Sequence, residues 1–168
     1  MIFIVNGAPG SGKTTFENYA KKFARGPVIL LSTISYVKKV ASMIGWEGYK
    51  TDQDRRFLSD LKHALGRWRD LPVEEVKREI RAAYAYFEEE PLIFVDCREP
   101  DEIRRLCGEL NAMSLIVRRD SAESAPTSNL SDASVLLYQY DIQIDNNGTL
   151  EELEDIAKEF LEKYEKPA

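Results

Sequence analysis

The chain has 168 residues, of which 43% are hydrophobic and 31% are charged, and its formal net charge at pH 7 is −6. These values are typical of one soluble globular domain with a core of its own. Its longest apolar runs, of five or six residues, are too short to span a membrane, and no secretory signal is visible before the first predicted strand. We therefore expect a cytoplasmic protein without a membrane partner.

The charge and the metal-ligating residues narrow the function classes further. A negative net charge argues against general electrostatic binding of nucleic acid, so any contact with DNA or RNA must rely on local basic clusters. Cys97 and Cys107 lie far from each other in the sequence, and His63 is the single histidine. This pattern predicts reduced, buried thiols and excludes a structural zinc site or a disulfide framework.

The first predicted elements are a buried strand over residues 2–5 (IFIV), the loop NGAPGSGKTT and an amphipathic helix. The spacing Gly7-x-x-x-x-Gly12-Lys13-Thr14 is the P-loop pattern, and strand, loop and helix are the context that it requires. At ordinary residue frequencies these four fixed positions arise by chance in roughly one chain of this length in a hundred or more. Thr15 replaces the third glycine of a dinucleotide fingerprint, which excludes that alternative.

This loop predicts a site for the phosphates of a nucleotide. Glycines let the backbone approach the phosphates closely, and the N–H groups at the start of the helix point at the anionic oxygens. We expect Lys13 to contact the β and γ phosphates and to act in catalysis, and the Thr14 hydroxyl to bind Mg²⁺. The predicted nucleotide-binding residues are Gly7, Ala8, Gly10, Ser11, Gly12, Lys13, Thr14 and Thr15.

The elements that follow alternate between short apolar runs and amphipathic helices. Gly26-Pro27 ends the first helix, and strands are predicted over residues 28–31, 92–95, 114–117 and 140–145. The first of the later helices is predicted after a cap at 32–35 and ends at Gly45, and the second covers about 52–68 with Trp68 on its apolar side. Further helices are predicted after Pro72, after Pro100, and after a Thr149–Glu152 capping box with Leu150 buried. Residues 120–134 are small and polar and predict a long mobile loop.

Buried strands that alternate with helices predict an α/β fold with a parallel sheet covered on both faces. Ligands of such sheets bind beyond the carboxyl ends of the strands, and polar residues follow all the predicted strands. After the phosphate loop, these residues are Ser32, Thr33, Asp96, Arg98, Arg118, Arg119, Asn146 and Asn147.

Each of these side chains has a functional and a structural interpretation. Asp96 could orient Mg²⁺ or an acceptor hydroxyl, or it could be a helix N-cap ahead of Pro100. Arg98 could hold a substrate phosphate, or lie on the surface. Arg118 and Arg119 could meet the transferring phosphoryl group, or face solvent.

The helix after residue 51 has two interpretations. Asp52 with Arg56 and Arg56 with Asp60 are i,i+4 pairs that stabilise an exposed helix. Alternatively, this region lines the site for an anionic substrate. The residues that would do so are Arg55, Lys62, Lys38 and Lys39, with Tyr36, Trp46 and Tyr49 able to stack on a base.

The segments GAPGSGKTT, VDCREPDEI and YDIQIDNNGTLEEL together resemble the nucleoside-monophosphate-kinase-like group of P-loop kinases. Within this group the chain is most similar to phage-type deoxynucleoside monophosphate kinases and to kinases of 5-hydroxymethyluracil in phage DNA. The resemblance implies a three-layer α/β/α P-loop NTPase fold, a five-stranded sheet in the order 2-3-1-4-5 and a single domain over residues 1–168. It places substrate-side helices at about 35–89, a lid at about 118–134, and Asn146 and Asn147 near the adenine of ATP.

The predicted function is transfer of the γ-phosphate of MgATP to a nucleotide-type acceptor, with ATP and Mg²⁺ as cofactors. The acceptor is either a free deoxynucleoside monophosphate or a hydroxymethylated pyrimidine in DNA. The sequence leaves open a kinase of another small metabolite, and an ATPase or switch without a phosphate acceptor.

Overall fold

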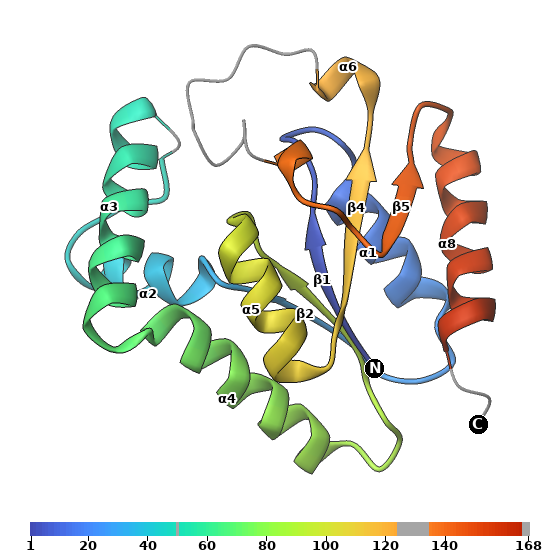
Figure 1. Ribbon diagram of the computed structural model, residues 1–168, viewed down its shortest axis with the longest axis horizontal. Helices are drawn as coiled ribbons and strands as arrows, with labels where there is room; N and C mark the ends of the chain where they lie inside the picture. Colours follow the sequence, from blue (N-terminus) through green and yellow to red (C-terminus); the bar gives the residue numbers. More distant parts are fainter. Residues whose placement is uncertain (50, 124–134, 166–168) are drawn as a thin grey trace.

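The computed structural model describes residues 1–49, 51–123 and 135–165. A five-stranded parallel sheet in the order β2-β3-β1-β4-β5 forms its middle layer (Figure 1). The strands are β1 (Ile2–Asn6), β2 (Val28–Ser32), β3 (Leu92–Asp96), β4 (Met113–Arg118) and β5 (Ile142–Asp145). The expected sheet, its parallel pairing and its strand order are confirmed.

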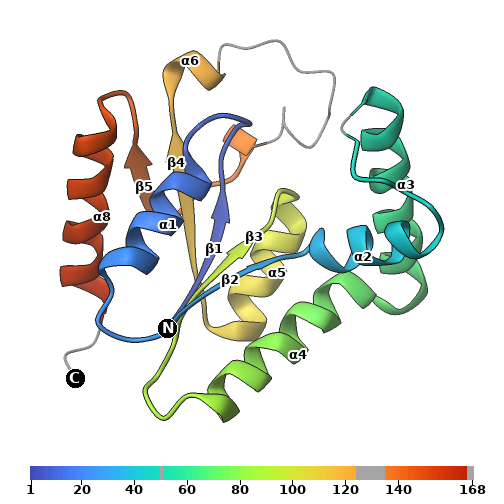
Figure 2. The same ribbon diagram turned by 180° about the vertical axis from the view of Figure 1, so that it is seen from behind.

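Helices lie on both faces of this sheet (Figures 1 and 2). Helices α1 and α8 cover one face, and α4 and α5 cover the other. The helices are α1 (Lys13–Phe23), α2 (Ser35–Met43), α3 (Asp52–Arg69), α4 (Leu71–Tyr86), α5 (Pro100–Leu110), α6 (Asp120–Glu123) and α8 (Leu150–Tyr164), with a 3₁₀ turn η1 (Val135–Leu137). No helix in the described part of the chain combines the length and the apolar character needed to cross a bilayer.

The strands alternate their side chains between two cores, as a sheet covered on both faces requires. Phe3 and Val5 pack with α1 and α8, whereas Ile2 and Ile4 pack with α4 and α5. The first core is aromatic, and the Phe3 and Phe160 ring centroids lie 4.9 Å apart with the rings at 62°. This packing holds α1, and with it the loop that precedes α1, firmly against the sheet.

The helix boundaries confirm several local signals. Gly45 follows α2 with a φ of 101°, Pro72 lies in the first turn of α4, and Thr149 and Glu152 form the capping box of α8. The expected cap of α2 is wrong, because its N-cap is Ile34 and no side chain caps it.

One residue expected to be buried is exposed, and one strand is shorter than expected. Leu150 is 59% exposed. Trp68, on the apolar side predicted for the helix after residue 51, is 67% exposed. Helix α3 packs on α2 and α4 at the margin of the molecule, and none of its residues is buried. Strand β5 begins at Ile142, because the Asp141 carboxylate accepts the Ser114 N–H at 2.8 Å in place of a backbone carbonyl.

The predicted lid coincides only partly with the described residues. Asp120–Glu123, expected to be part of the loop, forms the short helix α6. The remainder of the predicted lid, residues 124–134, lies outside the part of the chain that the structure describes.

Candidate active site

The phosphate loop runs from the end of β1 to the start of α1 and depends on its glycines. Gly7 and Gly12 have φ angles of 149° and 97°, which residues with a side chain rarely adopt. A Cβ atom at Gly7 would lie 2.3 Å from the Val117 carbonyl oxygen, and one at Gly12 would lie 2.2 Å from Nδ2 of Asn146. The loop is therefore packed tightly against β4 and against the residue that follows β5.

The start of α1 presents the groups that the P-loop pattern predicts. Gly12 is the N-cap and no side chain caps the helix, so a ligand can accept from the N–H groups of its first turn. The Lys13 ammonium group donates to the Gly7 carbonyl at 2.6 Å and lies 3.4 Å from the Ala8 carbonyl, which keeps it over the loop. The Thr14 side chain is exposed beside it. These groups fit the phosphates of a nucleotide.

Asp96 ends β3 between the ends of β1 and β2, where it pairs in register with Val5 and Ser32. Its Oδ1 atom is buried and has no hydrogen-bond partner. Burial raises the pKa of this carboxyl group, and the charges of Lys13, Arg98 and Lys38 oppose that rise. An acceptor oxygen left without a donor, beside three cations, fits a metal-bound water or a substrate hydroxyl.

Glu17 is a second carboxyl group at this site that the sequence analysis missed. It lies one helical turn after Lys13 on α1 and is only 4% exposed. Burial raises its pKa to about 8, with the neighbouring Asp96 raising it further and Lys13 lowering it. Glu17 is consequently mostly protonated at pH 7. The signal for it was an acidic residue directly after the buried Phe16, on the side of α1 that faces the sheet.

The residues predicted to bind the acceptor differ in exposure and in their hydrogen bonds. Lys38 on α2 and Arg98 after β3 are exposed, and both charges act on Asp96. Thr33 is buried, and its N–H donates to the Asp96 carbonyl at 3.1 Å. The Ser32 hydroxyl accepts from the Ile34 N–H at 3.4 Å, and Tyr36 is half-buried. Lys38 and Arg98 are thus the predicted residues that the structure brings to Asp96.

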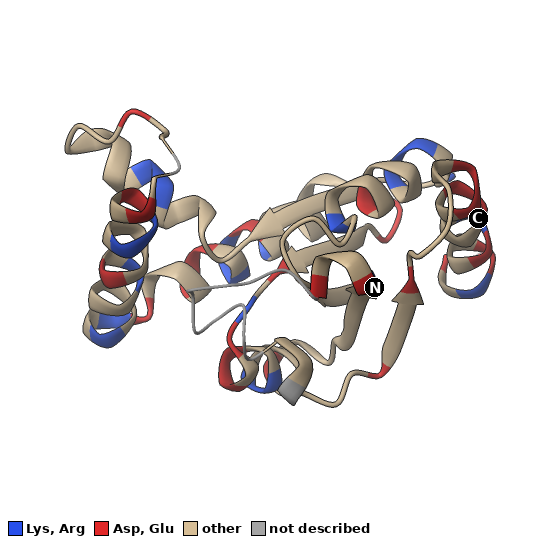
Figure 3. Cartoon of the chain, turned by 90° about the horizontal axis from the view of Figure 1, so that it is seen from above, with Lys and Arg blue, Asp and Glu red and all other residues tan. Residues whose placement is uncertain are grey.

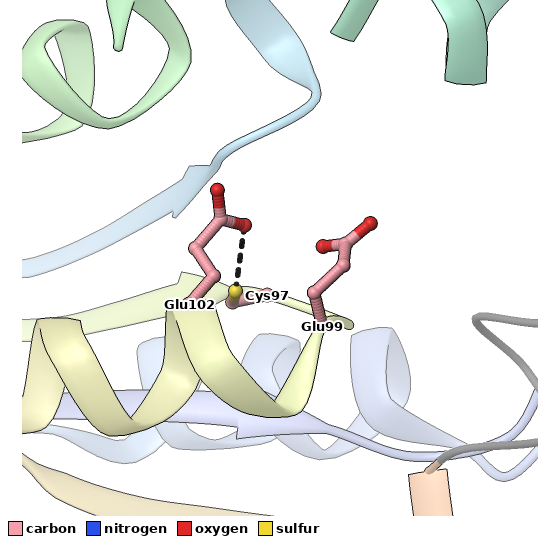
Figure 4. A group of neighbouring side chains, drawn as sticks. All are labelled: Cys97, Glu99 and Glu102. Carbon is pink, nitrogen blue, oxygen red and sulfur yellow. Dashed lines mark hydrogen bonds between the residues drawn. The ribbon is translucent and has the colours of Figure 1, made fainter. Parts of the chain in front are cut away.

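Lys62 forms an ion pair that links α3 to the start of α5. Its Nζ atom lies 2.5 Å from the Glu99 carboxylate and 2.7 Å from that of Glu102, and its side chain is 12% exposed. Figure 4 shows both glutamates beside Cys97, whose thiol donates to Glu102 at 3.0 Å. Burial raises the pKa of that thiol well above its usual value. Although these three acidic groups could hold a metal ion, Lys62 already supplies positive charge there.

The residues after β4 are tied to their own segment. Arg118 makes two hydrogen bonds to Glu123 in α6, of 2.8 and 2.7 Å, and this partner raises its pKa. The Arg119 carbonyl accepts from the N–H groups of Ala122 and Glu123. Their predicted catalytic role therefore requires Arg118 to exchange its partner. Arg55 is exposed on α3.

Asn146 and Asn147 directly follow β5, and Asn146 contacts the phosphate loop. Asn146 is buried, donates to the Ser11 carbonyl at 2.8 Å and lines a cavity of about 360 Å³ between β5 and α8. The Asn147 side chain accepts from the Asp120 N–H at 2.9 Å. Asn146 thus positions the loop directly, whereas the expected proximity of both residues to adenine stays a prediction.

Comparison of the fold with solved structures finds similar proteins at low sequence identity. The Deinococcus radiodurans tunicamycin resistance protein is 14% identical over 99% of this chain and 96% of its own, with a TM-score of 0.59. Shikimate kinase from Aquifex aeolicus is 13% identical over 97% of both chains, with a TM-score of 0.50. No protein-family model and no curated protein matches the sequence. These likenesses show the fold, which is that of the P-loop kinases.

Proposed function

We propose that residues 1–168 form one kinase domain that transfers the γ-phosphoryl group of MgATP to an acceptor carrying an anionic group. The observation that carries this proposal is the convergence at one sheet edge of a glycine-built phosphate loop, Lys13 and the orphaned carboxylate oxygen of Asp96. Phosphoryl transfer needs little covalent chemistry from the protein. It needs in-line positioning and neutralisation of the transferred charge, which these groups can supply.

The donor side is assigned as follows. Backbone N–H groups of Gly10 and of residues 12–14 would bind the phosphates, and Lys13 would neutralise charge on the group in transfer. The exposed Thr14 hydroxyl and Asp96 would hold Mg²⁺, which would supply further positive charge to the phosphates. Asn146, at the cavity after β5, would position the loop beneath the nucleotide, with Asn147 near the base.

The acceptor is proposed to be nucleotide-like, in line with the resemblance of the sequence to deoxynucleoside monophosphate kinases. Lys38 and Arg98, whose charges act on Asp96, would hold the acceptor phosphate. Helices within about 35–89 would enclose its base. A hydroxymethylated pyrimidine in DNA is the second form of this acceptor, but a net charge of −6 favours the free nucleotide. Figure 3 shows the local exception, the Lys and Arg residues along α3.

The shikimate kinase likeness motivates one further acceptor class, a small hydroxylated metabolite with a carboxylate. Lys38 and Arg98 would recognise such an anion as readily as a phosphate.

Radiolabelled ATP with Mg²⁺ and a panel of acceptors tests the proposal. The panel holds the deoxynucleoside monophosphates, hydroxymethyluracil-containing DNA, shikimate and a neutral sugar. We expect label on an anionic acceptor, and release of phosphate without labelling of any acceptor would refute the kinase in favour of an ATPase.

Asp96→Asn tests the role of the carboxylate in the same assay. We expect a loss of about 10²-fold in kcat, because the amide keeps the shape but not the charge. Asp101→Asn is the matched control, since that carboxylate is 95% exposed on α5. Equal activity of both variants would remove Asp96 from the mechanism.

A further inference from the structure

Asn6 is a buried polar residue at the end of β1, and the mechanism above does not use it. It is 0% exposed, and both ends of its amide are bonded. Its Oδ1 atom accepts from the Gly7 N–H at 2.8 Å. Its Nδ2 atom donates to the Arg98 carbonyl at 3.1 Å and to the Tyr140 hydroxyl at 2.8 Å. One side chain thus joins the first amide of the phosphate loop to the residue proposed to hold the acceptor.

Tyr140 is the group that orients this amide. Its hydroxyl accepts from Asn6 and donates to the Val135 carbonyl at 2.9 Å, so both of its hydrogen-bonding functions are occupied. Burial raises its pKa to about 12, so the hydroxyl keeps its proton at neutral pH. Its ring is fixed by an edge contact with Tyr138 at a centroid distance of 4.9 Å. The chain Gly7–Asn6–Tyr140–Val135 is therefore continuous and has a defined direction of donation.

The direction of these bonds limits what Asn6 can do. Because Oδ1 occupies the Gly7 N–H, that amide is not available to a phosphate, and the phosphate-binding amides begin later in the loop. Because Nδ2 uses both of its hydrogens, rotation of the amide would break the bonds to Arg98 and to Gly7 together. The amide can thus have one orientation only while Tyr140 supplies its acceptor.

We propose that Asn6 and Tyr140 are positioning residues that hold the phosphate loop and the Arg98 backbone in a fixed register, so that the donor and acceptor groups meet in line. The proposal rests on the proposed kinase function. Neither residue touches a reacting atom. Their contribution is to the distance between two binding sites, and small errors in such distances are costly in transfer reactions.

Tyr140→Phe is the decisive variant, because it removes one oxygen atom and leaves the ring. We expect the melting temperature to stay within a few degrees and the affinity for MgATP to change by less than about twofold. We expect kcat to fall by about tenfold and KM for the acceptor to rise, because misplacement acts on the relation between the two sites. Asn6→Asp in the Tyr140→Phe background should lower kcat by less than the product of the single effects.

Tyr138→Phe is the matched control, since it is the same change on the neighbouring ring and its hydroxyl does not contact Asn6. Amide NMR supplies a readout that does not depend on activity. The Gly7 N–H donates to Asn6, and the Glu99 N–H belongs to the same peptide group as the Arg98 carbonyl that accepts from Asn6. We expect both N–H resonances to shift in Tyr140→Phe and to keep their positions in Tyr138→Phe.

The outcomes separate the two proposals. If the wild-type protein transfers no phosphate, the proposed function fails, and the Gly7 and Glu99 resonances alone decide the positioning role. If the wild-type protein is active but Tyr140→Phe matches Tyr138→Phe in kcat, acceptor KM and both resonances, the positioning role is refuted and the kinase remains. A change in stability without any change in kcat or KM also refutes it.

Discussion

The phosphate loop and helix α3 are held in place by different forces. The loop is fixed by tight contacts of Gly7 and Gly12 with Val117 and Asn146, and by hydrogen bonds from Asn146 and to Asn6. Helix α3 has 18 residues and none of them is buried, and its link to α5 is the ion pair of Lys62. Figure 3 shows how far it stands from the sheet.

This difference has a physical consequence. Apolar contacts and buried hydrogen bonds resist small displacements, whereas ion pairs in partly exposed positions contribute little and exchange partners easily. A region that binds the same phosphates in every cycle benefits from rigidity. A region that admits and releases an acceptor benefits from a weaker attachment. The predictions below test that contrast from the largest expected effect to the smallest.

Lys13→Ala should reduce kcat for phosphoryl transfer by about 10²- to 10³-fold, because a preorganised positive charge is lost from the transferred group. Its melting temperature should stay within a few degrees of the wild type, since the lysine ammonium group lies over the loop, on the Gly7 and Ala8 carbonyls, and not in the apolar core. Initial rates and a thermal melt measure both quantities. Lys21→Ala, an exposed lysine of the same helix, should leave the rate unchanged. Full activity in Lys13→Ala would mean that the loop is not the donor site.

Glu17 makes stability depend on pH at the rigid side of the site. Its pKa is about 8 in the folded protein and about 4.3 in an unfolded chain. Between these values the folded state binds more protons, so stability falls as pH rises, by roughly 2–3 kcal/mol from pH 5.5 to 7.5. Glu17→Gln should remove this fall.

Urea unfolding across that range measures the effect, and Glu162→Gln, an exposed change on α8, is the control. Equal pH slopes for the wild type and Glu17→Gln would show that Glu17 is ionised throughout.

Lys62→Met should lower the free energy of unfolding by about 1–3 kcal/mol, because Glu99 and Glu102 lose their cation in a partly buried position. Amide exchange should accelerate in α3 and stay unchanged in α4, whose inner face is buried in the core. Lys77→Met is the matched control, and its partner Glu109 is 42% exposed. Uniform acceleration across α3 and α4 would contradict a separate attachment of α3.

Trp68→Ala should change the free energy of unfolding by less than about 0.5 kcal/mol, because the indole is 67% exposed on α3. Denaturant titration measures it. A loss above about 2 kcal/mol would indicate that α3 is covered in solution. Phe16→Ala, in the aromatic core below the loop, should cost about 3–5 kcal/mol in comparison.

The fold was predictable because its signals are local. The run IFIV, the glycine spacing before Lys13 and the capping box at Thr149 each specify an element from neighbouring residues alone. The order of the strands came from the resemblance. The exposure of Trp68 could not be predicted, because it depends on which other elements cover α3.

The site was predictable only in part, since its other members depend on contacts between distant segments. Nothing near Lys62 indicates that Glu99 and Glu102 would neutralise it. Similarly, the sequence around Asn6 suggests only the first residue of a turn. Its proposed positioning role depends on hydrogen bonds to Arg98 and Tyr140, which lie 92 and 134 residues away in the sequence. Sequence spacing was sufficient to predict the phosphate loop, whereas the proposed acceptor side depends on contacts that only the structure gives.

Hydrogen–deuterium exchange with and without MgATP tests the central claim most directly. We predict that the amides of residues 10–14 become strongly protected on addition of MgATP, and that those of α3 do not until an acceptor is added. Pro9 has no amide hydrogen to exchange. Unchanged exchange at residues 10–14 with saturating MgATP would contradict the account, because the loop would then hold no triphosphate.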